Sequence, residues 1–467
     1  MLKKKKKTAS VKPKLLQVID SIPEKIFAQR RKHFIGQMLP DSVAFILSNP
    51  ERIRSNDTEY PYRQSSDVLY LSNFPEPQTV LILSNIDKKI EFKMIVRPRN
   101  REREIWTGRR FGVEGAIEKF ACQEAYTIDQ FVPVIREILA QAKNIYYKFG
   151  RNEELDKLFE PEWKRSSCSL HNPESITHEM RMVKDVSELV LMNQAAAISA
   201  EAHCTAMKLC KTGMMEYQLQ AEIERVFKSK GASGPAYGSI VAGGTNTIIL
   251  HYTENNMPLK NGELLLIDAA CEYQGYASDI TRTFPINGKF TEAQLDIYNL
   301  VLEAQKAAIS IAKPGVTLKQ LHEKASQVLR KGLIELGVLS PLMASAEAEE
   351  KALKHGSKND NKATPIVLRD LYMHGTGHWL GLDVHDVGTI GTRSKHAKTR
   401  PMEAGMVFTV EPGLYFDPED KRLPKKYRGI GVRIEDDVVI TKSGCEVLTS
   451  GVPKEPDEIE ELMAGSD

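Results

Sequence analysis

The chain has 467 residues, which is long for a single hydrophobic core, so the sequence predicts two domains. Hydrophobic residues make up 41% of it and charged residues 27%, and 64 basic residues nearly balance 62 acidic ones, which leaves a net charge of +2. This balance indicates no nucleic-acid partner, and no apolar run is long enough for a membrane span, so neither kind of partner is expected.

The first 15 residues form a basic segment with lysine at every position from Lys3 to Lys7. The apolar run of a signal peptide does not follow it, so we interpret residues 1–15 as a solvated, disordered tail. The six cysteines are scattered and include no CxxC pair, which is typical of reduced thiols, and the predicted location is therefore the cytoplasm.

Residues 16–175 are predicted to form a smaller N-terminal α/β domain. The β-prone run Val80–Leu83 and the helical pattern of Phe131–Ala142 indicate mixed secondary structure. Few residue types that perform chemistry cluster there. The domain is expected to end near His171–His178, where polar residues and Pro173 interrupt the pattern.

Residues 180–452 are predicted to form the second, larger domain, in which helices share the fold with β-hairpins. Three helix starts carry an N-cap residue and a Glu or Gln three positions later, namely Asp185 with Glu188, Thr291 with Gln294 and Thr317 with Gln320. The polar segment Leu339–Pro365 is interpreted as a surface insertion or mobile loop, and residues 453–467 as a frayed acidic tail.

Two β-prone runs around Gln274–Gly275 predict a hairpin that carries Asp268 and Asp279. In one register Asp268 faces Thr281 and the two carboxylates are diagonal neighbours, and in the other they are directly opposite. Both registers place them on one face. Two close carboxylates beside an apolar strand repel each other unless a cation lies between them, which favours a metal site over a solvated hairpin with outward acids.

A second acidic pair, Glu411 and Glu435, interrupts two further apolar runs. Arg433 lies two residues before Glu435 and so shares its face of a strand, where a guanidinium can hold a carboxylate or a bound substrate group. An outward-facing Arg433 is the alternative.

Three histidines, His374, His378 and His385, fall within twelve residues in a glycine-rich segment. The glycines at 375 and 377 argue against a helix and for a tight loop in which the backbone closely approaches another part of the chain. A single buried histidine is more often a core residue than a ligand, but this cluster indicates chemistry. His251 is a weaker fourth candidate.

These motifs resemble the pita-bread-fold metallopeptidases, and among them the aminopeptidase P (Xaa-Pro aminopeptidase) group. The resemblance covers most of the chain and rests on residues 62–71, 251–255, 268–285, 374–386 and 409–415. It implies an α/β (α+β) chain whose C-terminal pita-bread domain has a curved antiparallel sheet flanked by helices, after a smaller α/β N-terminal domain of the aminopeptidase P type.

The resemblance also implies roles for individual residues. The family's five metal ligands fall on Asp268, Asp279, His378, Glu411 and Glu435, with Asp279 and Glu435 bridging two cations or binding in a bidentate manner. Four carboxylates and one imidazole suit Mn²⁺ better than the His- or Cys-rich sets typical of zinc, so two divalent ions, Mn²⁺ first, are expected.

The same resemblance assigns catalysis to His251, His385 and Glu411, with Glu411 accepting the proton of the attacking water. Substrate binding falls on His374, Arg433, Tyr415 and Trp106. Trp106 corresponds to an aromatic residue that family members present from the N-terminal domain, sometimes of a neighbouring subunit. Ordinary packing is the alternative for Trp106.

The implied function is removal of the N-terminal residue from peptides with proline in second position, through a hydroxide that bridges two metals. The partners would be such peptides and further copies of the chain, as a homodimer or homotetramer. A prolidase that cuts only Xaa-Pro dipeptides is the first alternative. A metal-free pita-bread protein that acts as a binding module is the second, but such proteins lack several of the ligands that this chain retains.

Overall fold

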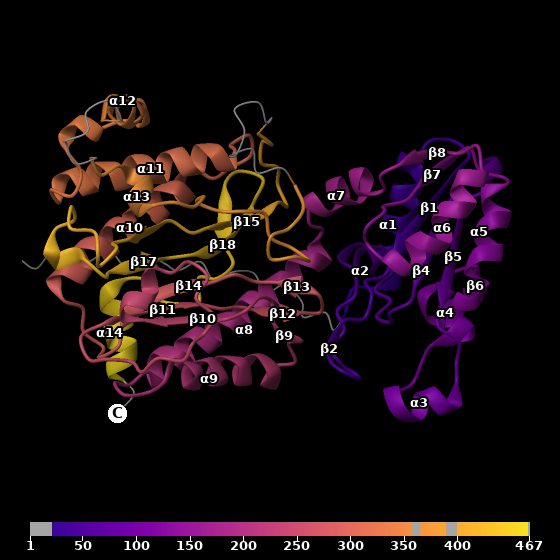
Figure 1. Ribbon diagram of the computed structural model, residues 1–467, viewed down its shortest axis with the longest axis horizontal. Coiled ribbons are helices and arrows are strands. Elements are labelled where there is room, and N and C mark those ends of the chain that lie inside the picture. The colour runs from indigo at the N-terminus through magenta and orange to yellow at the C-terminus, as the bar shows by residue number, and fades with distance from the viewer. Residues whose placement is uncertain (1–20, 357–364, 389–398, 466–467) are drawn as a thin grey trace, which may run out of the picture.

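The computed structural model describes residues 21–356, 365–388 and 399–465. The predicted basic tail 1–15 lies outside these ranges. Figure 1 shows two bodies side by side, a smaller one formed by the first third of the chain and a larger one formed by the rest. Helix α7 (Glu174–Met182) lies between them, close to the predicted domain boundary.

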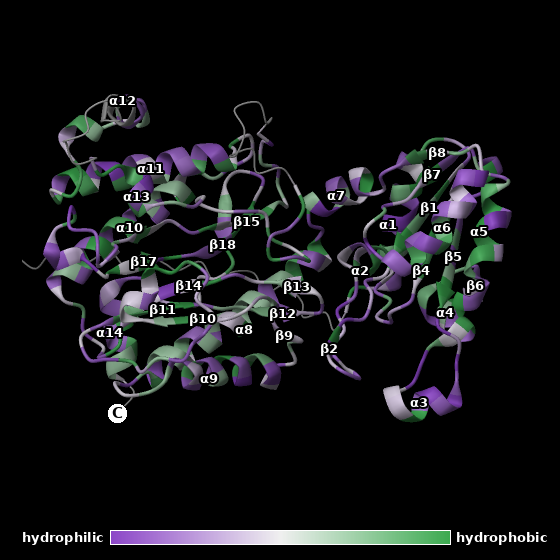
Figure 2. Cartoon of the chain, in the orientation of Figure 1, coloured by the Kyte–Doolittle hydropathy of each residue, from purple (hydrophilic) through white to green (hydrophobic). Residues whose placement is uncertain are grey.

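A six-stranded mixed sheet forms the centre of the N-terminal body. Its strands are, in order across the sheet, β6 (Glu124–Thr127), β5 (Glu91–Val96), β4 (Val80–Ser84), β1 (Ser42–Leu47), β7 (Asn144–Tyr146) and β8 (Ser169–His171). The strands β1 and β4 are entirely buried, as expected for apolar runs covered on both faces. Figure 2 shows apolar residues concentrated in this sheet.

Helices cover the sheet, and a small hairpin lies beside it. The helices are α1 (Glu24–Gln37), α2 (Ser66–Ser72), α3 (Arg101–Thr107), α4 (Gly112–Phe120), α5 (Phe131–Leu139) and α6 (Glu153–Arg165), and the hairpin strands are β2 (Ile53–Ser55) and β3 (Thr58–Glu59). The predicted strand at 80–83 and helix from 131 are thus confirmed. In Figure 1 helix α3 projects from the lower end of this body, below α4.

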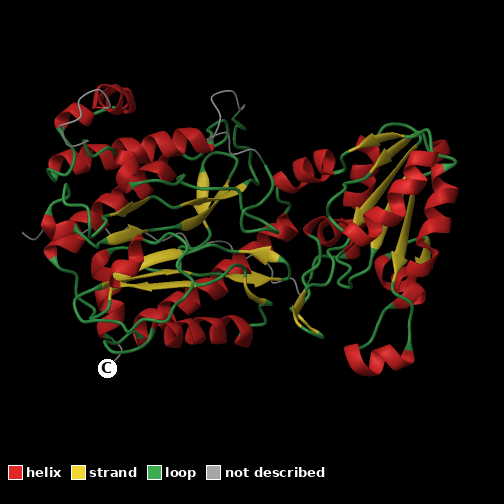
Figure 3. Ribbon diagram, viewed as in Figure 1, coloured by secondary structure: helices red, strands yellow, loops and turns green. Residues whose placement is uncertain are grey.

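The larger body has antiparallel strands at its centre and long helices outside them (Figure 3). In the described ranges its strands form four small sheets. The first sheet contains β10 (Ile240–Gly243), β11 (Leu264–Asp268) and β14 (Thr281–Pro285), and the second contains β13 (Tyr276–Ala277), β12 (Cys271–Tyr273) and β9 (Gly234–Pro235). The third contains β15 (Val407–Val410), β18 (Asp436–Ile440) and β19 (Cys445–Val447), and the fourth pairs β16 (Gly413–Tyr415) with β17 (Gly431–Arg433). Every ladder in these sheets is antiparallel.

Two pairs of long helices enclose these strands. They are α8 (Val186–Leu209) with α9 (Glu216–Ser229), and α10 (Glu292–Ile311) with α11 (Leu318–Glu335). The short helix α13 (Leu368–Leu371) packs beside α11. The predicted capping boxes are present at the starts of α8, α10 and α11. The predicted fold class, an α/β chain with an antiparallel pita-bread domain, is confirmed.

Two segments predicted to be irregular contain helices. Part of the predicted insertion is helix α12 (Ala346–Gly356), which the Ala/Glu-rich composition favours, while residues 357–364 lie outside the described ranges. The predicted frayed tail contains helix α14 (Pro456–Ala464), because Ile459 is fully buried and joins the main core while acidic residues begin the helix.

None of the helices in the described ranges has an apolar stretch long enough to cross a membrane.

Candidate metal centre

The broken hairpin β11–β14 positions the first two carboxylates of the site. Asp268 pairs with Thr281 and Tyr273 with Tyr276, which is the diagonal register. Gln274 and Gly275 both have positive φ, as this tight turn requires. Strand pairing stops after Asp268 and starts again in β12 and β13. Asp279 lies on the returning side, in the gap between β13 and β14. Both acids lie at the break and face the same side.

His378 lies on a loop that pairs with the edge of strand β15. The His378 amide donates to the Thr409 hydroxyl at 3.1 Å, and the Thr409 amide donates to the His378 carbonyl at 2.9 Å. A Cβ atom on Gly377 would overlap the carbonyl oxygen of Thr409. The loop predicted from the glycines is therefore confirmed, and Gly377 allows the close backbone approach that sets His378 beside Glu411.

Three of the five predicted ligands form a tight group, and the other two lie beside it. The Nε2 atom of His378 lies 3.4 Å from Asp279 Oδ2 and 3.7 Å from Glu411 Oε1. Ligand atoms of Asp279, His378 and Glu435 all lie within 4.8 Å of one another. Asp268 joins them through the hydroxyl of Tyr237, which lies 2.7 Å from Asp268 Oδ1 and 2.5 Å from Asp279 Oδ1.

The electrostatics of this cluster favour an added cation. Burial raises the pKa of Glu411 to about 7, and burial together with neighbouring carboxylates raises the pKa of Asp279 and of Glu435 above their usual range. Burial alone would lower the pKa of His378, but Asp279 and Glu411 outweigh it and raise that pKa to about 9. The raised pKa values of the carboxylates and of the imidazole both indicate uncompensated negative charge, so the donor set fits divalent metals.

The predicted substrate residues form a chain of hydrogen bonds beside the cluster. His374 Nε2 lies 2.8 Å from the Tyr415 hydroxyl, which accepts from Arg433 Nη1 at 3.0 Å. Arg433 Nη2 donates to Asp268 Oδ2 at 2.6 Å. Arg433 therefore faces inward and holds a carboxylate of the site. Burial and the charge of Arg433 lower the pKa of His374 to about 3, so this imidazole is neutral.

The remaining predicted residues occupy exposed positions. His385 and His251 are exposed, and the His385 ring stands edge-on to the His378 ring with 4.4 Å between centroids. Burial and the charges of His378 and His251 lower the pKa of His385. Trp106 is 86% exposed on helix α3 of the N-terminal body, so the structure brings it to no site residue of its own chain.

Comparison with protein-family models places this geometry in a known family. The model for metallopeptidase family M24 matches residues 190–442, which contain all five converging side chains. The chain belongs to family M24. The model for the aminopeptidase P N-terminal domain matches residues 27–146.

Individual relatives agree with the family model. The "Xaa-Pro aminopeptidase" of Escherichia coli is 40% identical over 96% of this chain and 99% of its own length, and the "Xaa-Pro aminopeptidase 3" of Homo sapiens is 32% identical over 94% and 84%. A solved Pseudomonas aeruginosa aminopeptidase superposes with a TM-score of 0.88 at 41% identity, covering 96% of this chain and 99% of the other. This M24 protein is therefore a metallo-aminopeptidase, and the prolidase alternative is not favoured.

Sequence reasoning missed Tyr237, which follows Gly234–Pro235 in a stretch without metal-site spacing. Its hydroxyl lies between Asp268 and Asp279, and burial raises its pKa well above the usual range, so it remains a hydrogen-bond donor. Thr281 holds the Oε2 atom of Glu435 at 2.6 Å in the same manner. These hydroxyls orient ligands without adding charge.

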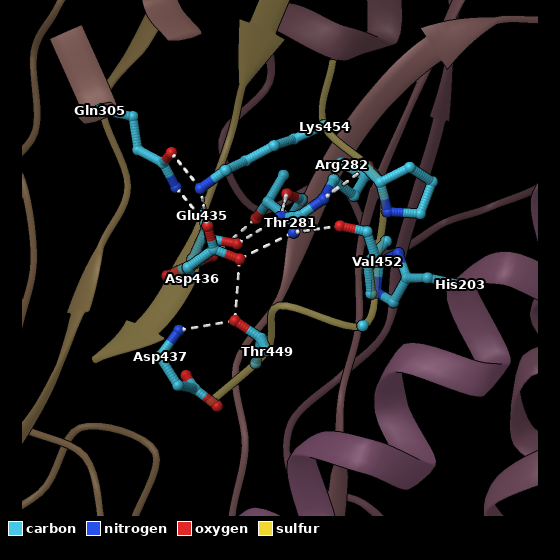
Figure 4. A network of polar contacts seen from close by, with 12 residues as sticks. His203, Thr281, Arg282, Gln305, Glu435, Asp436, Asp437, Thr449, Val452 and Lys454 are labelled. Carbon is cyan, nitrogen blue, oxygen red and sulfur yellow. Dashed lines mark hydrogen bonds and ion pairs between the residues drawn. The ribbon is translucent and has the colours of Figure 1, made fainter. Parts of the chain in front are cut away.

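Sequence reasoning also missed the charge network behind Glu435 (Figure 4). The carboxylate of Asp436 accepts from Arg282 Nη2 at 2.7 Å, from Lys454 Nζ at 2.6 Å and from Gln305 Nε2 at 2.8 Å. Arg282 Nη1 also donates to the Glu435 carbonyl at 2.6 Å. The backbone of the metal-ligand strand is thus tied to helix α10 and to the segment before α14.

The third consecutive acid holds the opposite side of the site. Asp437 accepts from the Asp279 amide at 3.1 Å and from the Ser278 hydroxyl at 2.6 Å. Thr449 links it to its neighbour, since the Asp437 amide donates to the Thr449 hydroxyl at 3.1 Å and that hydroxyl donates to Asp436 at 2.8 Å. Asp437 therefore fixes the backbone that carries Asp279.

Proposed function

We propose that this metallo-aminopeptidase removes the N-terminal residue from peptides whose second residue is proline. The observation that carries the proposal is the grouping of three buried carboxylates, the partly buried Glu411 and His378 in a chain 40% identical to a protein named Xaa-Pro aminopeptidase. A bond before proline has no N–H, so a peptidase that relies on pairing with that group loses a contact there. A dedicated site is required.

Asp268, Asp279, His378, Glu411 and Glu435 would hold two divalent cations, and we expect Mn²⁺ because the donor set is rich in oxygen. The converging ligand atoms and the raised carboxylate pKa values support this assignment. A solved Escherichia coli aminopeptidase P with a TM-score of 0.87 to this chain is described as zinc-substituted and in complex with product. Cations held here would supply Lewis acidity and a water that ionises near neutral pH.

Glu411 would accept the proton of the attacking water. Burial raises its pKa to about 7, which suits a group that takes and returns a proton near neutral pH. Its Oε2 atom lies 3.5 Å from Nδ1 of the neutral His374, which bonds the Gly375 carbonyl at 2.8 Å, so His374 lies beside the carboxylate without neutralising it.

His251 and His385 would donate hydrogen bonds to the scissile carbonyl and the leaving nitrogen as charge develops. Both imidazoles are exposed and His385 contacts the ring of His378, which suits groups that meet substrate at the mouth of the metal site. On the proline side, the hydrogen-bonded residues His374, Tyr415 and Arg433 would contact the substrate.

Trp106 would serve the site of another subunit in a homodimer or homotetramer. The support is its 86% exposure beside Ile105, which is 75% exposed, on a helix that projects from the N-terminal body. Large apolar side chains exposed together are typical of an interface. We further expect a cytoplasmic enzyme without nucleic-acid or membrane partners, which its balanced charge and six free cysteines support.

The decisive experiment compares Xaa-Pro dipeptide with Xaa-Pro-Yaa tripeptide as substrates of EDTA-stripped protein re-supplied with Mn²⁺, Zn²⁺ or Co²⁺. We expect activity only with added metal, the highest activity with Mn²⁺, and faster turnover of the tripeptide. Preference for the dipeptide would overturn the proposed substrate class, and full activity without metal would overturn the proposed site.

A further inference from the structure

The N-terminal domain contacts the active-site loop that carries His385. The motif Tyr62–Asp67, singled out above for its family resemblance, leads into helix α2, and side chains of this motif contact the loop. The Ser66 hydroxyl donates to Asp383 Oδ1 at 2.7 Å, and Arg63 Nη2 donates to the Leu382 carbonyl. Two residues of the N-terminal domain thus hold the stretch that immediately precedes His385.

The imidazole of His385 has no hydrogen-bond partner among the described residues. Its position therefore depends on the backbone that carries it and on its edge contact with His378. Both ends of the loop are anchored, because the Ala277 amide donates to the Gly381 carbonyl at 2.8 Å and the Asp386 amide donates to the Trp379 carbonyl at 2.9 Å. The ring stays available to substrate while its backbone is fixed.

Arg181, on helix α7 between the two domains, joins the acids on either side of His385. Its Nη2 atom lies 2.7 Å from Asp383 Oδ2 and 2.6 Å from Asp386 Oδ1, and its Nη1 atom donates to Asp67 at 3.0 Å. The Arg181 side chain is 4% exposed and that of Asp386 1% exposed. One buried guanidinium therefore connects the loop to helix α2.

Lys184 completes the buried end of this arrangement. Its Nζ atom lies 3.1 Å from Asp386 Oδ2, and a Cβ atom on Gly381 would overlap that same oxygen. The carboxylate of Asp386 is thus clasped between two cations and the backbone of its own loop. Because a buried charge that loses its partner is costly, the loop is held strongly in one conformation.

We propose that Arg181 and Asp67 are positioning residues for His385, through which the N-terminal domain completes the active site of its own chain. Arg181 holds Asp383 and Asp386 together, and Asp67 fixes the direction of its guanidinium. With the loop fixed, the His385 ring stands edge-on to His378 and meets the substrate without reorganisation. This inference rests on the role proposed above for His385.

The test uses the Mn²⁺-loaded full-length enzyme and an Xaa-Pro-Yaa tripeptide. Asp67→Asn removes the charge of one partner of Arg181 and keeps its shape, and Arg181→Gln removes the guanidinium itself. We expect kcat to fall about threefold and at least tenfold, respectively, with smaller changes in KM. Metal content, measured by mass spectrometry, stays at the wild-type value because no ligand changes. Arg181→Lys recovers part of kcat, since lysine restores the charge but not the three-way geometry.

Arg330→Gln is the matched control. Arg330 pairs with Glu349 at 3.1 Å with side chains 11% and 10% exposed, and this pair joins α11 to α12 away from the loop. We expect it to lower Tm as much as Asp67→Asn does while leaving kcat unchanged. Equal losses of kcat in Arg330→Gln and Asp67→Asn would assign the effect to general stability and overturn the proposal.

A double-mutant cycle with His385→Ala separates this inference from the function beneath it. If Arg181 acts through His385, Arg181→Gln lowers kcat at least tenfold in wild type and less than twofold in the His385→Ala background. Equal losses in the two backgrounds, or unchanged kcat in Arg181→Gln while His385→Ala is impaired, would overturn the positioning role alone. Unimpaired His385→Ala would overturn the role of His385 and the inference together.

Discussion

Glu435 and Asp436 are adjacent in sequence and buried to nearly the same extent, 2% and 0% exposed, yet they lie in opposite electrostatic environments. Asp436 meets Arg282 and Lys454, which outweigh burial and lower its pKa to about 2. Glu435 faces Asp279 and Glu411, and burial raises its pKa well above the usual range. The protein supplies its own cations to one acid and leaves the other acid uncompensated. A buried carboxylate cluster of the second kind indicates a place for metal ions.

The largest effect is expected when the uncompensated cluster loses a carboxylate. Glu435→Gln or Asp279→Asn removes a charge and a ligand atom, so we expect activity to fall by more than about 100-fold, beyond the loss typical of residues that only orient ligands. Bound metal should fall in parallel while circular dichroism stays that of wild type. Full activity in either variant would show that the uncompensated carboxylates do not hold a metal that the reaction needs.

The compensated acid should respond in stability instead. Asp436→Asn leaves Arg282 and Lys454 buried beside a neutral amide, so we expect the free energy of unfolding to fall by about 3–5 kcal/mol, as when a buried ion pair is broken. The measurement is urea denaturation of the Mn²⁺-loaded protein. Lys289→Gln, which breaks an exposed pair with Glu460, is the control and should cost at most about 1 kcal/mol. Equal effects would show that Asp436 is not specially compensated.

The two environments also predict opposite responses to pH. The pKa of Glu411 is raised from 4.5 to about 7, so its protonation stabilises the metal-free protein below pH 4.5 and this contribution is lost as pH rises to about 7. The increase in Tm caused by Mn²⁺ should therefore grow between pH 5 and 7. The pKa of Asp436 is lowered from 3.8 to about 2, so its contribution is present above pH 3.8 and lost only as pH falls toward 2. A Tm increase independent of pH between 5 and 7 would contradict the account.

The smallest effect is expected at Tyr237. Tyr237→Phe removes one hydroxyl from between Asp268 and Asp279 and leaves every charge in place, so we expect metal affinity to fall about tenfold. Isothermal titration with Mn²⁺ measures this directly, and Tyr147→Phe, which removes a hydroxyl bonded to Asp156 in the N-terminal body, serves as the control. An unchanged affinity would mean that the ligands need no help from this hydroxyl.

The sequence predicted those parts of the site that local pattern determines. The hairpin follows from the turn signal at Gln274–Gly275, although its register was one of two alternatives, and the approach of His378 to β15 follows from Gly377. Acids placed in apolar strands indicated a cation site, and the family resemblance then assigned its five ligands. Helix starts with capping pairs were predicted for the same reason, since the signal lies within four residues.

What could not be predicted depends on long-range contacts. Nothing near Asp436 in sequence indicates that Arg282 and Lys454, more than 15 residues away on either side, will meet it. Tyr237 reaches the site from an irregular stretch, and the chain end folds as α14 because Ile459 finds the core, although its composition is acidic. The link from Asp67 to Asp386 through Arg181 likewise exists only once both domains are folded.

The most direct test of the central claim is a count of metal ions bound by EDTA-stripped protein titrated with Mn²⁺, with cleavage of an Xaa-Pro-Yaa peptide followed in the same samples. We predict two ions per chain in the wild-type protein, with activity rising as they bind, and fewer than two with little activity in Glu435→Gln. Two ions and full activity in Glu435→Gln, or full wild-type activity without bound metal, would contradict the account.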